Sequence, residues 1–307
     1  MDAKRQKKAE ELLLTEASFR TNAFRIINIM IELCGENPGC KVHVDEILHS
    51  IFFLGLFRKP QKCTPHDILG EFMPAVKEIF SGPFENYTSK LPKRTPFSSV
   101  LDMVVSLLGP DIEINILVER LQEIANRMSE PNSKYKFNSS TICVSQRNDV
   151  QRSYYGASMS CNGKQEGQIM VAVSCLSTWH CGVSNAVMTY KPDKNKRKNF
   201  DGTMKLQEYV KCQASNVKSG EEMSPCRSCG HLFGLEKPSN QMWPYGNCAE
   251  AESLSKLLYG EEEIVKNVVP SVDCKMREQV VNEVKAHLEE MLKESEFQWD
   301  SSYYIPQ

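Results

Sequence analysis

The sequence lacks several features that would place it in a common enzyme class. It has no Gly-rich phosphate loop of the Walker or dinucleotide type, so a nucleotide hydrolase or a Rossmann oxidoreductase is not expected. The motifs of serine hydrolases are also missing. The formal net charge is only −2 over 307 residues. No overall attraction to nucleic acid or to an acidic membrane is therefore expected, and any such contact has to be local.

Long apolar runs are missing as well. The longest apolar stretch, Ile47 to Phe57, is interrupted by His49, Ser50 and Gly55 and is too short to span a bilayer. The first residues are polar and basic and lead into a periodic helix, without the apolar centre of a signal peptide. These features predict a protein with no membrane span, located in the cytoplasm or, alternatively, in the nucleus.

The chain has 12 cysteines. Without a secretion signal we expect reduced thiols, which act as metal ligands or as small buried side chains. Cys34, Cys143, Cys161 and Cys175 lie in largely apolar segments and are expected to be ordinary buried thiols. The remaining question is which of the other cysteines bind a metal.

Helical periodicity dominates the first 130 residues. Apolar residues recur at helical spacing in the first segment, and Thr64 followed by Pro65 is typical of a helix start. Gly109-Pro110-Asp111 separates two later helices. Helices are predicted at Leu12–Met30, Val44–Phe57, Pro65–Phe80, Ser98–Leu108 and Ile112–Met128. Residues 1–130 are therefore expected to form an all-helical bundle, an interaction or regulatory module able to bind a protein partner.

The pattern changes after a polar linker at Glu130 to Lys134. An antiparallel meander of about four strands is predicted at Thr141–Ser145, Tyr154–Cys161, Gln168–Leu176 and Asn185–Tyr190. Helices are predicted at Met204–Ala214, after Cys248 and at Lys275–Glu294. Residues 135–307 are therefore expected to form an α+β domain, an antiparallel sheet followed by C-terminal helices.

The segment with the clearest chemistry contains Cys226 and Cys229. Two cysteines separated by two residues can direct both sulfurs to one zinc ion at about 2.3 Å. Cys248 follows after a short interval, at a predicted helix start where a thiolate is favoured. Glu250 lies two residues further on, in the first turn of the same helix. The three cysteines are therefore predicted zinc ligands.

These residues resemble a known family. Pro225-Cys226-x-x-Cys229 and Cys248-Ala249-Glu250 are similar to the two signature motifs of the zinc-dependent cytidine deaminase superfamily. The resemblance implies that the three cysteines bind zinc, that a zinc-activated water attacks the amino-bearing ring carbon, and that Glu250 is the catalytic acid/base. The substrate would be a nucleoside, a nucleotide or a nucleic-acid base. The two motifs occur here in reversed order, and the similarity covers only Pro225 to Glu250.

A structural zinc site is the alternative. His231 is a candidate fourth ligand, and a Cys₃His site would be closed and without chemistry. Glu250 would then be an ordinary carboxylate at a helix N-terminus. The protein would be a non-catalytic, zinc-stabilised interaction protein, for example an intracellular defence or signalling adaptor.

A basic loop lies between the predicted sheet and the next helix. Its side chains could contact the phosphates of a nucleic acid or form a nuclear-import patch, although a solvated turn is the commoner explanation. The residues in question are Lys194, Lys196, Arg197 and Lys198. Three aromatic residues, Phe200, Trp243 and Tyr245, could line a pocket near the metal.

Overall fold

The computed structural model describes residues 3–128, 132–161, 163–192 and 194–307. Its N-terminal part is helical, as predicted, and the type of each predicted helix is confirmed. The helices are α1 (Ala3–Glu36), α2 (Lys41–Gly55), α3 (Pro65–Leu69), α4 (Met73–Ile79), α5 (Ser81–Asn86), α6 (Pro96–Leu108) and α7 (Ile114–Met128), with short 3₁₀ turns η1 (Pro38–Cys40) and η2 (Gly70–Phe72). Of the predicted linker, Glu130 and Pro131 lie outside the described residues.

The single helix predicted over residues 65–80 is divided in the structure. Thr64 caps α3 as expected: its hydroxyl accepts from the amide of Asp67, and the Asp67 carboxylate accepts from the amide of Thr64 at 2.8 Å. Gly70 then adopts a φ of +53°, which no α-helix contains, so α3 ends and α4 begins after η2.

The four-stranded antiparallel sheet has the order β2-β1-β3-β4. Its strands are β1 (Thr141–Arg147), β2 (Ser153–Ala157), β3 (Val210–Asn216) and β4 (Glu222–Met223). The sheet type and the first two strands agree with the prediction, although β2 ends before Cys161. The prediction of a helix at Met204–Ala214 is wrong. This segment is irregular up to Gln207, and after a turn β3 begins at Val210 and pairs along the whole of β1.

The strands predicted at Gln168–Leu176 and Asn185–Tyr190 are also wrong. These segments lie in α8 (Lys164–Val173), the π-helical turn η3 (Ser174–Thr178) and α9 (Cys181–Met188). Residues 169–173 are all buried. A helix that is apolar on every side shows no 3.6-residue period, and its β-branched residues then resemble a buried strand.

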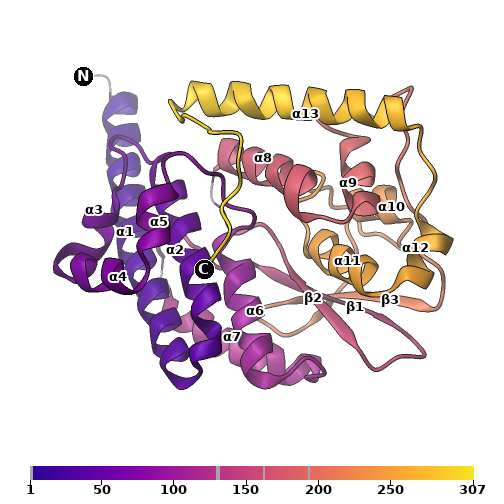
Figure 1. Ribbon diagram of the computed structural model, residues 1–307, viewed down its shortest axis with the longest axis horizontal. Helices are drawn as coiled ribbons and strands as arrows, with labels where there is room; N and C mark the ends of the chain where they lie inside the picture. The colour runs from indigo at the N-terminus through magenta and orange to yellow at the C-terminus, as the bar shows by residue number, and fades with distance from the viewer. Residues whose placement is uncertain (1–2, 129–131, 162, 193) are drawn as a thin grey trace.

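The remaining elements are α10 (Arg227–Phe233), α11 (Ala249–Gly260), α12 (Glu262–Val268) and α13 (Cys274–Glu294). The helices predicted after Cys248 and at residues 275–294 are confirmed. Figure 1 shows α11 above the sheet, α8 and α9 beyond it, and α13 along the outside. The fold is therefore α+β. Among the described helices, none has the length and apolar character needed to cross a bilayer.

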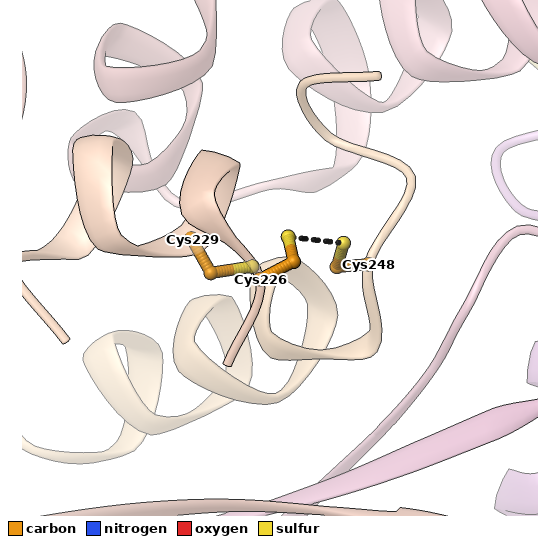
Figure 2. A group of neighbouring side chains, drawn as sticks. All are labelled: Cys226, Cys229 and Cys248. Carbon is orange, nitrogen blue, oxygen red and sulfur yellow. Dashed lines mark hydrogen bonds between the residues drawn. The ribbon is translucent and has the colours of Figure 1, made fainter. Parts of the chain in front are cut away.

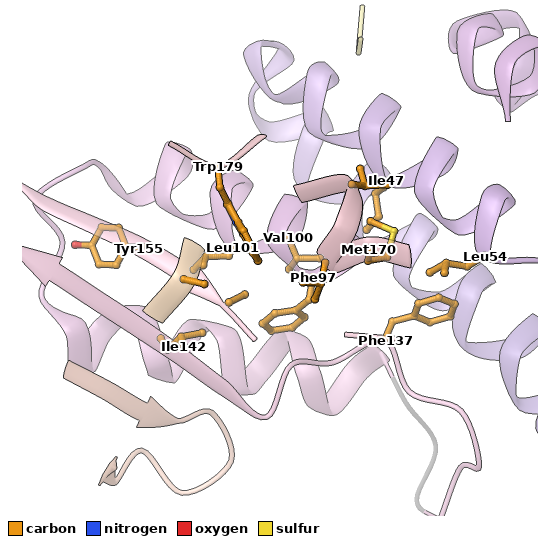
Figure 3. Close-up of a cluster of buried hydrophobic side chains, with 14 of the residues drawn as sticks. Ile47, Leu54, Phe97, Val100, Leu101, Phe137, Ile142, Tyr155, Met170 and Trp179 are labelled. Carbon is orange, nitrogen blue, oxygen red and sulfur yellow. The ribbon is translucent and has the colours of Figure 1, made fainter. Parts of the chain in front are cut away.

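The helical part and the α+β part share one hydrophobic core. Leu54 of α2 and Phe97 of α6 belong to the same buried cluster as Ile142 of β1, Met170 of α8 and Trp179 (Figure 3). The C-terminal tail returns over the N-terminal helices (Figure 1). There, Tyr304 donates its amide to the carbonyl of Leu91 at 2.8 Å and its hydroxyl to Asp45 at 2.6 Å.

Candidate metal centre

Three cysteines meet at the beginnings of two helices. Cys226 is the N-cap residue of α10, Cys229 lies in the first turn of α10, and Cys248 is the N-cap residue of α11 (Figure 2). Their Sγ atoms all lie within 4.8 Å of one another, and those of Cys226 and Cys248 are 3.4 Å apart. In the described parts of the chain, this is the one group of three or more His, Cys, Asp or Glu side chains able to hold a metal ion.

The loop between the two helices is held against the start of α10. The amide of Arg227 donates to the carbonyl of Gln241 at 2.8 Å, and the amide of Ser239 donates to the carbonyl of Pro225 at 2.8 Å. Gly246 has a φ of +88°, and a Cβ built there would lie 2.7 Å from a methyl carbon of Val171. Glycine is required at this turn, which positions Cys248 beside Cys226.

The donor set fits a thiophilic ion. Sulfurs bound to one tetrahedral zinc at about 2.3 Å lie about 3.8 Å apart, which is close to the separations found here. Hydrogen bonds from Cys229 and Cys248 hold the pKa of the Cys226 thiol far below its usual range. The same hydrogen bonds raise the pKa of Cys229 and of Cys248. One thiolate is thus stabilised by its two neighbours, and a bound metal would replace their protons.

Glu250 is a buried carboxyl group beside the cysteines. It is 4% exposed and lies in the first turn of α11. Burial raises the pKa of Glu250, the negative charge of Cys226 raises it further, and a hydrogen bond with Cys229 works in the opposite direction. The carboxyl group therefore keeps a proton to higher pH than an exposed glutamate does.

A cavity of about 250 Å³ opens beside these groups. Cys226, Cys248 and Glu250 line it, and Glu250 is the one Asp, Glu, Lys or Arg among its lining residues. Residues from the sheet and the loop form the other walls, namely Ser140, Thr141, Ser158, Met159, Ala214, Met223, Ser224, Ser239, Gln241, Trp243, Asn247 and Ala249. The cavity combines an apolar indole and thioether with several hydrogen-bonding groups, which suits a small polar ring.

The candidate fourth ligand lies elsewhere. His231 is exposed, its Nδ1 lies 2.9 Å from the hydroxyl of Tyr245, and it is not part of the three-cysteine group. Of the three aromatic residues proposed for the pocket, Trp243 does line the cavity. Tyr245 stacks on Tyr190 with ring centroids 4.0 Å apart, and Phe200 is buried; neither lines the cavity.

The four residues of the basic loop do not line the cavity either. Arg197 forms an ion pair with Glu283 of α13 and donates to the carbonyl of Met188. Lys194, Lys196 and Lys198 are all exposed, and Lys196 lies 2.6 Å from the carboxylate of Asp201. Arg197 thus joins the loop to α13, and any contact of the loop with a nucleic acid stays a prediction.

A network of buried charges behind α11 was not foreseen. The carboxylate of Glu252 accepts from the hydroxyl of Ser98 at 2.9 Å and from the amide of Ala157 at 3.0 Å. Arg94 lies between Glu252 and the carboxylates of Glu46 and Asp102. The sequence signal for it was limited to the i, i+4 spacing of Glu252 with Lys256, which form an ion pair at 3.1 Å. Apart from Ala157 of β2, the other partners of Glu252 come from the helical part of the chain.

A scan against protein-family models, a search of curated proteins and a search of solved structures each found no match. The function therefore has to be argued from the geometry and chemistry of the site.

Proposed function

We propose that the chain is a zinc-dependent hydrolase of the deaminase type, acting on an amino-bearing nucleobase. The observation that supports this most directly is that a buried glutamate lines the same small cavity as Cys226 and Cys248, two of the three cysteines of the metal-capable group. A structural zinc site needs neither the cavity nor the carboxyl group. Their combination is the one expected for metal-assisted hydrolysis.

The ligand count supports a catalytic ion. Three protein ligands with a fourth open position are typical of catalytic zinc sites, whereas structural sites have four protein ligands. Cys226, Cys229 and Cys248 would hold the ion, and His231 is engaged with Tyr245 outside the group. When bound, zinc would supply Lewis-acid chemistry that makes water nucleophilic at neutral pH.

Glu250 would move the protons. Its raised pKa brings the carboxyl group closer to neutral pH, where an acid/base catalyst is most effective. A carboxyl oxygen of Glu250 would take a proton from the attacking water and then donate a proton to the leaving amino group. Burial keeps this carboxyl group away from bulk water, so it would exchange protons mainly with the substrate in the cavity.

The cavity walls would orient the base. Trp243 offers an indole face for stacking, and Asn247 with Ser140 and Thr141 offers hydrogen-bonding groups for ring substituents. Trp243 is 54% exposed and therefore lies where the cavity meets solvent.

The test is hydrolytic release of ammonia from cytosine- and adenine-containing compounds by the zinc-loaded protein. Glu250→Gln is expected to lower the rate by about three orders of magnitude, because the acid/base group is lost, while zinc content and Tm stay close to the wild-type values. Glu263→Gln, at an exposed glutamate, is the matched control and should keep full activity. An unchanged rate in Glu250→Gln would contradict the mechanism.

A second function is favoured by a different observation. Several large apolar side chains of the N-terminal helices are exposed, among them Leu13, Leu14, Phe72 and Ile79. Leu13 and Leu14 are adjacent in α1, and exposed apolar residues that lie together are typical of protein-binding surfaces. The chain could then be a non-catalytic interaction protein stabilised by zinc. In that case Glu250→Gln should have little effect on function, and Cys226→Ala should unfold the α+β part.

A further inference from the structure

A second hollow adjoins the cavity of the candidate metal centre. It is a groove of about 660 Å³ that shares Ser140 with the cavity, and its walls come from α7, from the segment 136–140 before β1 and from the end of β3 with the turn that follows. The groove is more than twice as large as the cavity. Ser140 therefore lies at the boundary between the two hollows.

The groove and the cavity differ in charge. Lys136, Lys218 and several amide residues line the groove, and none of its lining residues is an Asp or Glu. Both lysines are exposed, and no carboxylate among the described residues forms an ion pair with either of them. The cavity has no basic lining residue and contains Glu250. A phosphate group is thus disfavoured inside the cavity and favoured in the groove.

We propose that the substrate is a nucleotide within a single-stranded nucleic acid. This inference rests on the proposed deaminase function. The target base enters the cavity beside Glu250, and the sugar-phosphate backbone continues past Ser140 along the groove, where Lys136 and Lys218 contact phosphates. A base has to leave its stack to reach a buried site, which a single strand permits at low cost.

The size of the groove and the placement of the lysines favour a strand over a mononucleotide. Lys136 precedes β1 and Lys218 follows β3, so the two cations come from separate segments and can each contact a different phosphate. The amide groups of Asn126 and Asn216 on the same walls can donate to phosphate or sugar oxygens, while Gln122 donates to the carbonyl of Lys218 at 3.1 Å. None of the residues of the basic loop, 194–198, lines the groove.

The experiment compares three substrates that carry the same base: the nucleoside, its 5′-mononucleotide, and single strands of about 12 nucleotides in DNA and RNA form. For the zinc-loaded protein, kcat/KM is expected to be at least about tenfold higher for a strand than for the nucleoside or the mononucleotide. Binding of the strand should also weaken with salt, with a log–log slope of about −1.4 from two neutralised phosphates.

The test variant is Lys136→Ala/Lys218→Ala. It should lose about tenfold in kcat/KM on the strand and most of the salt dependence, and keep the nucleoside rate. Lys77→Ala/Lys275→Ala, at two exposed lysines that line neither the groove nor the cavity, is the matched control and should change nothing. Equal turnover of mononucleotide and strand, or an unaffected double variant, would overturn the inference and leave the proposed chemistry standing.

Measuring the binding of a labelled single strand tests this inference independently of the proposed deaminase function. If no compound is deaminated, the proposed function fails, and the fluorescence anisotropy of a labelled strand still tests the groove. Binding that is lost in Lys136→Ala/Lys218→Ala supports the groove as a single-strand site. Absence of binding by the wild-type protein overturns it.

Discussion

The Sγ atoms of Cys226 and Cys248 lie 3.4 Å apart, although the residues are 22 positions apart in sequence. Each is the residue directly before a helix, α10 for Cys226 and α11 for Cys248. The metal centre therefore depends on how these two helices are positioned relative to each other. Residues that hold α11 in place should affect the site without touching it.

Arg94 is such a residue. It joins Glu46 of α2 and Asp102 of α6 to Glu252 of α11, and although burial opposes this, Arg94 holds the pKa of Glu46 below its usual range. Arg94→Ala leaves the buried Glu46 without its cation and removes one of the two cations that Asp102 and Glu252 share with Lys256, so it should lower the free energy of unfolding by about 3–5 kcal/mol. Urea unfolding measures this change.

The control for Arg94 is an exposed ion pair. Lys62 and Glu296 are 3.4 Å apart and largely solvated, so Lys62→Ala should change the free energy of unfolding by less than about 1 kcal/mol. Equal effects of the two variants would show that the buried network does not stabilise α11.

α11 packs closely against Gly156 of β2. A Cβ at this position would lie 2.3 Å from the amide nitrogen of Ser253 and 2.5 Å from the carbonyl oxygen of Ala249. Gly156→Ala should therefore push α11 away from the sheet, destabilise the protein by about 1–3 kcal/mol and weaken metal binding. Thermal unfolding and zinc titration measure the two effects.

Gly167 provides the comparison. It lies in α8, and a Cβ there would meet its nearest atom, the Sγ of Cys161, at 3.9 Å. Gly167→Ala should be neutral or stabilise by up to about 1 kcal/mol, because alanine favours a helix. If both variants were equally well tolerated, the close packing of α11 on β2 would be unimportant for the site.

The metal ligands could be predicted from the sequence because the patterns that indicate them lie within short segments. The spacing of Cys226 and Cys229 and the helix start at Cys248 needed no long-range information, and the structure brings the three together. The opposite wall of the cavity could not be predicted. Ser140 lies directly before β1 and Thr141 is its first residue, and a single sequence does not reveal which distant segment faces a loop.

The type of a helix or strand could be predicted where one of its faces is exposed to solvent, because apolar and polar residues then alternate with a recognisable period. The helix at residues 275–294 showed its period because its outer face is exposed. The run at 168–176 was mistaken for a strand because burial on all sides removes that period. Residues 210–214 were mistaken for part of a helix, although their conformation follows from pairing with the distant β1.

His49 should make the stability depend on pH. It is fully buried in α2 and stacks on Tyr304 with ring centroids 3.9 Å apart, and burial lowers its pKa to about 3. The unfolded chain, with an ordinary histidine pKa of about 6.5, binds the proton more readily below that pH. Stability should therefore fall as the pH drops from 6.5 towards 3, by about 2 kcal/mol between pH 7 and pH 5.

The matched variant for this prediction is His49→Phe, which keeps a ring against Tyr304 and has no titrating group. The difference in free energy of unfolding between wild type and variant, measured in urea at pH 7, 6 and 5, should shift by that amount in favour of the variant. Other titrating groups cancel in the difference. Parallel curves over this range would contradict the assignment of a neutral, buried His49.

Metal content is the most direct test of the central claim that Cys226, Cys229 and Cys248 hold a zinc ion. We expect about one zinc per chain in freshly reduced protein. The ion should be lost in the Cys226→Ala/Cys248→Ala variant and retained in Cys181→Ala, which removes an exposed thiol. Wild-type protein without zinc, or equal zinc in the double variant, would contradict the account.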